Sequence, residues 1–225
     1  MSVTDKVLQL KQDFDDVYEA GKKAQYDEFW DNFQINGTRG YYHYGFASHF
    51  GWNATNFKPK YDIVPTQATY IFYGFRQPSL KPFVDDRGIK LDFSQCKGMT
   101  YAFMSSELTE LGTIDVSSAG TAISGVFQAC SKLVTIEKLI MANTNKNSMF
   151  TGCTNLENIT IEGVIGNNFV ISDCTKLTHD SLMSIINHLE NKTSGTFTLS
   201  IGSTNLAKLS DAEKAIATQK GWTLA

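Results

Sequence analysis

A repeated pattern through the middle of this 225-residue chain constrains its fold more than any other feature. Three segments each place an apolar residue, a cysteine and a leucine at intervals of three, with a period of 21 to 24 residues. A unit of this length cannot bury its own apolar face, so neighbouring units have to stack and complete one another's core. The expected ladder of buried positions consists of Phe103, Phe127, Cys130, Leu133, Phe150, Cys153, Leu156, Cys174 and Leu177.

The cysteines of this pattern are expected to be structural. Cysteine suits a cramped internal position because it behaves as a small hydrophobe with a weak donor. The copy that begins at Phe103 has serines where the cysteine would fall. No C-x-x-C pair or histidine cluster accompanies the four cysteines, which excludes the common zinc spacings. A catalytic or redox role would need a basic residue at a constant distance from each cysteine in the sequence, and there is none. We expect reduced thiols; disulfides are the alternative if the chain is secreted.

The recurring F-x-x-C-x-x-L-x-x-I pattern at residues 127 to 139 and 150 to 161 resembles the BspA-like leucine-rich repeats of bacterial surface and phage-associated proteins. The resemblance covers residues 67 to 178 and implies a curved right-handed solenoid used for binding, not for a chemical reaction. The expected fold class is therefore α+β: a short BspA-like leucine-rich-repeat solenoid with an N-terminal helical arm and a C-terminal helix-strand cap.

Residues 1 to 35 are expected to form the helical arm. Apolar side chains spaced by 4, 3, 4 and 3 residues predict a heptad seam, which is typical of a coiled coil. The alternative is an ordinary amphipathic helix packed on the end of the repeats, but the narrow stripe favours an intermolecular partner. The resemblance to tail-associated proteins implies a homotrimer. The expected oligomerisation residues are Val3, Val7, Leu10, Phe14 and Val17.

Residues 36 to 66 are expected to form an aromatic-rich N-terminal cap. The simpler interpretation is that their rings pack against the first repeat. The alternative is a stacking platform for sugars, because an aromatic face offers apolar area beside a polar group. The candidate ligand-binding residues are Tyr41, Tyr42, Tyr44 and Trp52.

Residues 179 to 225 are expected to form a C-terminal cap. Thr178 can cap a helix that runs through Asn191, and strand-like alternation follows at residues 197 to 201. Ser210 and Glu213 form a capping-box pattern that opens a second helix, and a last short strand is expected at residues 222 to 224.

The composition and the absence of known motifs exclude several classes of function. A net charge of -3 and a pI near 5.8 argue against nucleic acid as a partner. No apolar run approaches the length of a membrane span, so we expect neither membrane insertion nor a signal peptide. Common nucleotide-binding, metalloprotease and serine-hydrolase motifs are absent from the sequence, which predicts a protein that is not an enzyme and needs no cofactor or metal. A hydrolase using Asp115 or Asp173 is a weaker alternative without a paired base.

Two functional hypotheses remain. The first is a phage tail-associated or surface recognition module that binds a protein or a cell-surface glycan. Segments near both ends of the sequence also resemble prophage tail-associated proteins of gut bacteria, which implies location in a virion. The alternative is a protein-protein interaction scaffold in the bacterial cytoplasm. Because fold does not fix function, the ligand stays open at this point.

Overall fold

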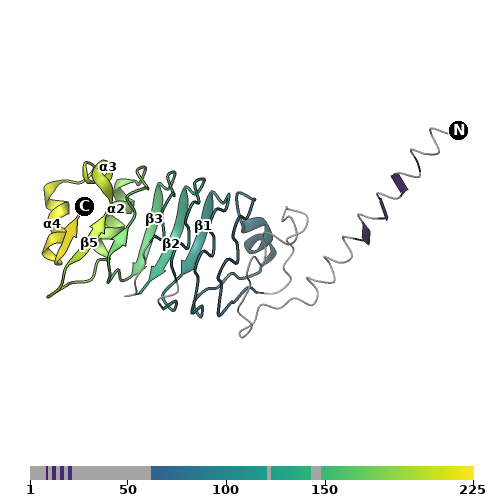
Figure 1. Cartoon of the computed structure of the whole chain (residues 1–225), viewed down its shortest axis with the longest axis horizontal. Coiled ribbons are helices and arrows are strands. Elements are labelled where there is room, and N and C mark those ends of the chain that lie inside the picture. The colour runs from purple at the N-terminus through teal and green to yellow at the C-terminus, as the bar shows by residue number, and fades with distance from the viewer. Residues whose placement is uncertain are drawn as a thin grey trace.

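The computed structural model describes residues 62–120, 123–142 and 148–225, together with the helical residues 9, 12, 13, 16, 17, 20 and 21 (Figure 1). The fold is α+β with two small parallel sheets. The first sheet has the order β1-β2-β3 and the second the order β4-β5-β6. The strands are β1 (Glu110–Asp115), β2 (Thr135–Met141), β3 (Asn158–Gly163), β4 (Phe169–Val170), β5 (Phe197–Ser200) and β6 (Trp222–Leu224).

Two single-turn 3-10 helices precede the first sheet, and three α-helices follow it in the chain. The 3-10 helices are η1 (Lys81–Phe83) and η2 (Asp85–Arg87). The α-helices are α2 (His179–Asn187), α3 (Gly202–Leu206) and α4 (Asp211–Gln219). In Figure 1 the strands β1, β2 and β3 lie side by side in the middle of the body, and the α-helices lie toward the C-terminal end.

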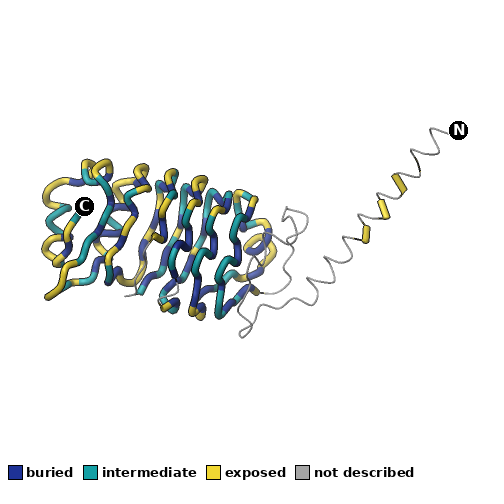
Figure 2. The backbone as a smooth tube through the Cα atoms, in the orientation of Figure 1, coloured by how far each residue is buried: buried dark blue, intermediate teal, exposed yellow. Residues whose placement is uncertain are grey.

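The first sheet is built from the regularly spaced apolar residues of the repeats. Ile136 of β2 pairs with Leu111 of β1 and with Ile159 of β3, so three buried side chains form one row across the strands. The buried side chains are three residues apart in β1 and two apart in β3, and the positions between them carry polar residues or glycine. Figure 2 shows buried and more exposed positions following one another along the strands.

A column of stacked phenylalanine rings fills the interior beside the sheet. The ring centroids of Phe72 and Phe103 are 5.3 Å apart, those of Phe103 and Phe127 5.6 Å, and those of Phe127 and Phe150 5.3 Å. The backbone joins the same turns, since Phe103 N–H donates to the carbonyl of Val126 at 2.8 Å. Ring packing and backbone bonding therefore fix the same alignment of successive repeats.

The expected leucine-rich-repeat solenoid is wrong, because the strands form two separate small sheets instead of one sheet that continues through the repeats. The first sheet ends at β3, where α2 takes the next position. The Ser181 hydroxyl accepts from Ile159 N–H at 3.0 Å, and the Ser184 hydroxyl accepts from Ile161 N–H at 2.8 Å. Serine side chains thus satisfy the edge of β3 that a further parallel strand would otherwise pair.

The C-terminal segment follows its local sequence signals. Thr178 caps α2, although this helix ends at Asn187, before the predicted Asn191, because Leu189 forms a β-bridge with Ile165. The capping box predicted at Ser210 and Glu213 is confirmed: the Ser210 hydroxyl accepts from Glu213 N–H at 3.3 Å, and the Glu213 carboxylate accepts from Ser210 N–H at 2.8 Å. The predicted last strand is confirmed as β6.

The described residues of the N-terminal arm are helical. The side-chain amides of Gln9 and Gln12 donate to Asp13 and Asp16, each at 2.8 Å, which are the i,i+4 contacts of a helix surface. Val17 is 73% exposed. The other four seam residues, Val3, Val7, Leu10 and Phe14, lie outside the described residues. Across the described positions, no helix is long and apolar enough to cross a membrane.

Candidate functional site

A cavity of about 300 Å³ lies beside β1, at the first edge of the β1-β2-β3 sheet. Residues 111 to 114 of β1 form one wall, and η1, η2 and the segment at Lys90 and Leu91 form the other. Because β1 is the edge strand of its sheet, the wall includes strand backbone as well as side chains. The site therefore combines the edge of a sheet with a short helical cover.

The helical cover is folded by local signals. Pro82 near the start of η1 supplies a backbone angle suited to a helix, and Phe83 anchors this turn in the core. Gly88 ends η2 with a φ of 70°, a conformation that glycine adopts without a steric penalty. The chain then returns through Ile89, whose N–H donates to the Val84 carbonyl at 2.9 Å. These turns hold Lys81 over the sheet edge.

Lys81 bridges two carboxylates at the cavity. Its Nζ lies 3.4 Å from Glu110 Oε2 on β1 and 3.2 Å from Glu137 Oε1 on β2. These hydrogen bonds, to Glu137 first and then to Glu110, raise the pKa of Lys81. Hydrogen bonds from the Ser79 hydroxyl and then from Lys81 lower the pKa of Glu110. Lys81 and Glu110 are therefore both charged at neutral pH, and Glu137 adds a second carboxylate to the single ammonium of Lys81.

Two hydrogen-bonding positions at the cavity remain open to a ligand. An ammonium group has three N–H donors, and the two carboxylates occupy two of those of Lys81. Glu137 Oε2 has no hydrogen-bond partner within the described part of the chain, and the Glu137 side chain is 56% exposed. One donor and one acceptor thus stand side by side at the mouth.

Gly112 leaves space next to this acceptor. A Cβ atom built on Gly112 would meet only Glu137 Oε2, at 3.8 Å, which is an ordinary contact distance. Glycine within a strand weakens the strand, and it often marks a place where a ligand or another backbone approaches closely. Gly112 therefore leaves the wall of the cavity open, although its backbone conformation does not require a glycine.

One end of the cavity is closed by contacts between its two walls. Thr109 N–H and the Thr109 hydroxyl both donate to the Pro78 carbonyl, at 2.7 and 3.0 Å. The Ser79 hydroxyl donates to Glu110 Oε1 at 2.8 Å. These bonds join the segment before η1 to the start of β1, so the space is a pocket with a closed end.

Lys90 lies on the wall opposite β1 and is paired with a neighbour. Its Nζ is 2.7 Å from Asp92 Oδ2, and Lys90 N–H donates to Asp62 Oδ1 at 2.8 Å. The hydrogen bond from Lys90, followed by those from Ser94, lowers the pKa of Asp92 to about 2. The Lys90 ammonium is thus engaged, and the cavity lining as a whole carries three carboxylates, those of Asp85, Glu110 and Glu137, against the two ammonium groups of Lys81 and Lys90.

The exposed face of the β1-β2-β3 sheet continues from the cavity. Polar residues at the start of the three strands form one row, because Glu110 is paired with Thr135 and Thr135 with Asn158. Beyond the register shift between β2 and β3, Lys138 and Glu162 form an ion pair whose charged groups are 2.8 Å apart. Side chains far apart in the sequence thus form one continuous polar surface.

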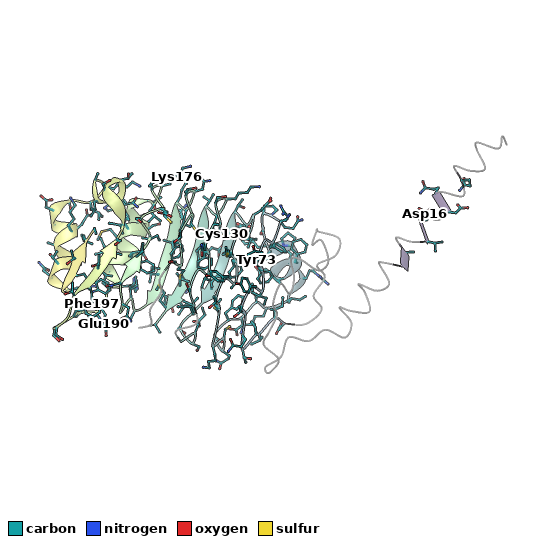
Figure 3. All side chains as sticks on the ribbon, in the orientation of Figure 1. Asp16, Tyr73, Cys130, Lys176, Glu190 and Phe197 are labelled. Carbon is teal, nitrogen blue, oxygen red and sulfur yellow. The ribbon has the colours of Figure 1, made fainter. Side chains whose placement is uncertain are left out.

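The residues of the predicted ladder are all buried and lie away from this surface. Figure 3 shows Cys130 within the body, at the level of the central strands. Burial raises the pKa of Cys130 to about 12 and that of Cys96 to about 11, and contact with Cys174 followed by burial raises that of Cys153. These thiols are therefore protonated at neutral pH and unsuited to nucleophilic attack.

Asp115 and Asp173, the aspartates of the hydrolase alternative, do not line the cavity. Tyr41, Tyr42, Tyr44 and Trp52 lie outside the described residues. Asp115 accepts from Ser117 N–H at 2.8 Å, and Asp173 accepts from Gly152 N–H at 2.8 Å. Both of these aspartates stabilise turns.

Sequence reasoning missed the cluster of Lys81, Glu110 and Glu137. Its lysine is 29 and 56 residues away from the two glutamates in the chain, and no motif links them. The alternation of apolar and polar residues in β1 and β2 places both glutamates on the exposed face. A glycine at position 112, between Leu111 and Thr113 in a segment that otherwise favours a strand, is a local signal of an opening there.

No group of three or more His, Cys, Asp or Glu side chains that could hold a metal ion occurs among the residues that the structure describes. Comparison of the chain with protein-family models, with curated proteins and with solved structures gives no match. The argument for function therefore rests on the geometry of the cavity and of the exposed sheet face.

Proposed function

We propose that this chain is a non-enzymatic binding module that recognises a bacterial surface, as part of a phage tail or of a surface protein. The recognition surface is the exposed face of the β1-β2-β3 sheet together with the cavity at its first edge. The observation that carries the proposal is that side chains from three strands form one polar surface that ends in a pocket. Ligand sites combine concave shape with a few fixed polar groups in the same way.

The protonation states at the cavity favour binding over catalysis. A general acid needs a pKa near the working pH, but the pKa of Glu110 is lowered. A nucleophilic lysine needs a lowered pKa, whereas that of Lys81 is raised. Both groups hold fixed charges, which suits them to positioning a ligand by hydrogen bonds.

Binding of the fluorescently labelled chain to a panel of intact bacterial strains, measured by flow cytometry, tests the proposal. Thr113 and Thr160 are exposed on the sheet face, so Thr113→Arg with Thr160→Arg adds bulk and charge there with little effect on folding. Thr223→Arg, at an exposed strand threonine of the other sheet, is the matched control.

We expect at least one strain to bind the wild-type chain and the Thr223→Arg variant, and the double variant to bind on the order of tenfold less. Absence of binding to every strain would contradict recognition of a bacterial surface. Equal loss in the control and the double variant would show that the sheet face is not the recognition surface.

A further inference from the structure

We infer that the cavity between η1, η2 and β1 binds a single neutral sugar ring, such as the terminal unit of a surface glycan. This inference rests on the proposed binding function and names the ligand class for its site. A lining without excess positive charge, a donor beside an acceptor, a small volume and a closed end support it.

Three carboxylates and two ammonium groups line the cavity: Asp85, Glu110 and Glu137 against Lys81 and Lys90. This excess of negative charge disfavours an anion. Lys81 already holds Glu110 and Glu137, so a cation would have to compete with that lysine for them. A neutral polar ligand displaces neither group and still meets strongly polarised hydrogen-bonding groups.

The groups that remain open match vicinal hydroxyls. A hydroxyl donates one hydrogen bond and accepts others, so two neighbouring hydroxyls bind best to a donor and an acceptor placed side by side. The third N–H of Lys81 and the free Oε2 of Glu137 provide this pair, and the exposed hydroxyl of Thr113 lies on the same wall. A sugar ring presents such adjacent hydroxyls along its edge.

The size of the cavity suits one ring. A volume of about 300 Å³ is at the lower end of the range for small-ligand pockets. One sugar ring with its bound waters is therefore a better fit than a long oligosaccharide.

A peptide strand is a less suitable ligand. An edge strand such as β1 can in principle pair with an added strand, but an extended backbone would have to run along the whole edge. The bonds of Thr109 to Pro78 and of Ser79 to Glu110 close the gap at the start of β1. A compact ligand enters a pocket with a closed end, whereas an extended one does not.

Gly112 provides a variant that fills the cavity without straining the fold. Gly112→Val adds an isopropyl group at a position where nothing obstructs a Cβ, and valine is favourable in a strand. Gly120→Val is the matched control, because Gly120 is exposed, has nothing within 4 Å of an added Cβ and does not line the cavity. Lys81→Met, which keeps the side-chain stem and removes the ammonium, is a second test that does not depend on Gly112→Val.

The experiment is saturation-transfer NMR and titration of the full chain with methyl glycosides of glucose, galactose, mannose, fucose and N-acetylglucosamine. Glucuronate and the tripeptide Ala-Lys-Ala serve as charged comparison ligands. Circular dichroism and urea unfolding establish that each variant is folded. We expect at least one neutral glycoside to bind, Gly112→Val and Lys81→Met each to lower its affinity about tenfold or more, and Gly120→Val to keep it.

Three results would overturn the inference: no binding of any neutral glycoside, tighter binding of glucuronate or the tripeptide, or unchanged affinity in folded Gly112→Val. Binding to bacterial cells separates this inference from the proposed function. A chain that binds cells through the sheet face but binds no glycoside still recognises a surface, and then only the sugar assignment fails. A chain that binds neither cells nor glycosides contradicts both.

Discussion

The cysteines of the repeats contribute to the fold in two ways, as small apolar groups and as weak hydrogen-bond donors. Cys130 Sγ donates to the Phe103 carbonyl and Cys153 Sγ to the Phe127 carbonyl, each at 2.9 Å. Ser106 occupies the equivalent position in the preceding copy. Ser106 N–H donates to the Phe103 carbonyl, and Cys130 N–H donates in the same way to the Phe127 carbonyl. A hydroxyl therefore fits this position sterically, and the difference between the two residues is one of desolvation.

Replacing Cys153 by serine should destabilise the fold by about 1 to 3 kcal/mol, because a hydroxyl costs more than a thiol to bury. Cys153→Leu should cost at least as much, since the site is fully buried and has no room for a larger side chain. Urea unfolding measures both changes, and thiol labelling of the native chain is the control. Rapid labelling of all four cysteines would show that these positions are not buried.

Stability should fall at alkaline pH because the buried thiols resist ionisation. The pKa of Cys130 is raised from 9.0 to about 12, so in the unfolded chain this thiol loses its proton first. Its contribution is fully present below pH 9 and declines between pH 9 and 12, by about 1.4 kcal/mol for each pH unit. Cys130→Val removes this titration. A wild-type chain and a Cys130→Val chain with parallel stability curves above pH 9 would contradict the assignment.

At the scale of elements, α2 ends the first sheet through its serine hydroxyls. Ser181→Ala leaves Ile159 N–H and the Glu157 carbonyl without their side-chain partner, and an unsatisfied buried group costs about 1 to 3 kcal/mol. Ser203→Ala, at an exposed serine of α3, should change stability by less than about 0.5 kcal/mol. Hydrogen exchange at Ile159 should accelerate in Ser181→Ala alone. Unchanged protection there would mean that α2 does not stabilise the edge of β3.

The parts of the fold that could be predicted from sequence are those set by local spacing. The capping box at Ser210 fixes the start of α4, and the interval of three between apolar residues identifies buried positions such as Phe127. The division into two sheets depends on contacts between α2 and β3 that local patterns do not encode. The strand β4 has only two residues, too few for a recognisable alternation. The cluster around Lys81 was missed for the same reason, since it joins three separate segments.

At the scale of the whole molecule, the expected helical arm would determine how many copies of the chain act together. Its described residues are helical, and Val17 of the predicted seam is 73% exposed. A valine exposed on a helix gains free energy when a partner helix covers it. Three copies joined by such a seam would present three cavities, so weak binding of single sugar rings would add up to firm attachment.

We therefore predict that the full chain associates, with a trimer as the expected state, through Val3, Val7, Leu10, Phe14 and Val17. Three or four heptads make a short coiled coil, so association should depend on concentration. Light scattering should give a trimer mass for the full chain and a monomer mass for a chain that begins near Asn36. Val17→Asp should weaken association because it places a charge in the seam, whereas Gln12→Lys should not, because it adds a charge outside the seam and keeps a donor for Asp16. A full chain that stays monomeric at high micromolar concentration would contradict the prediction, and the arm would then have no role in joining copies.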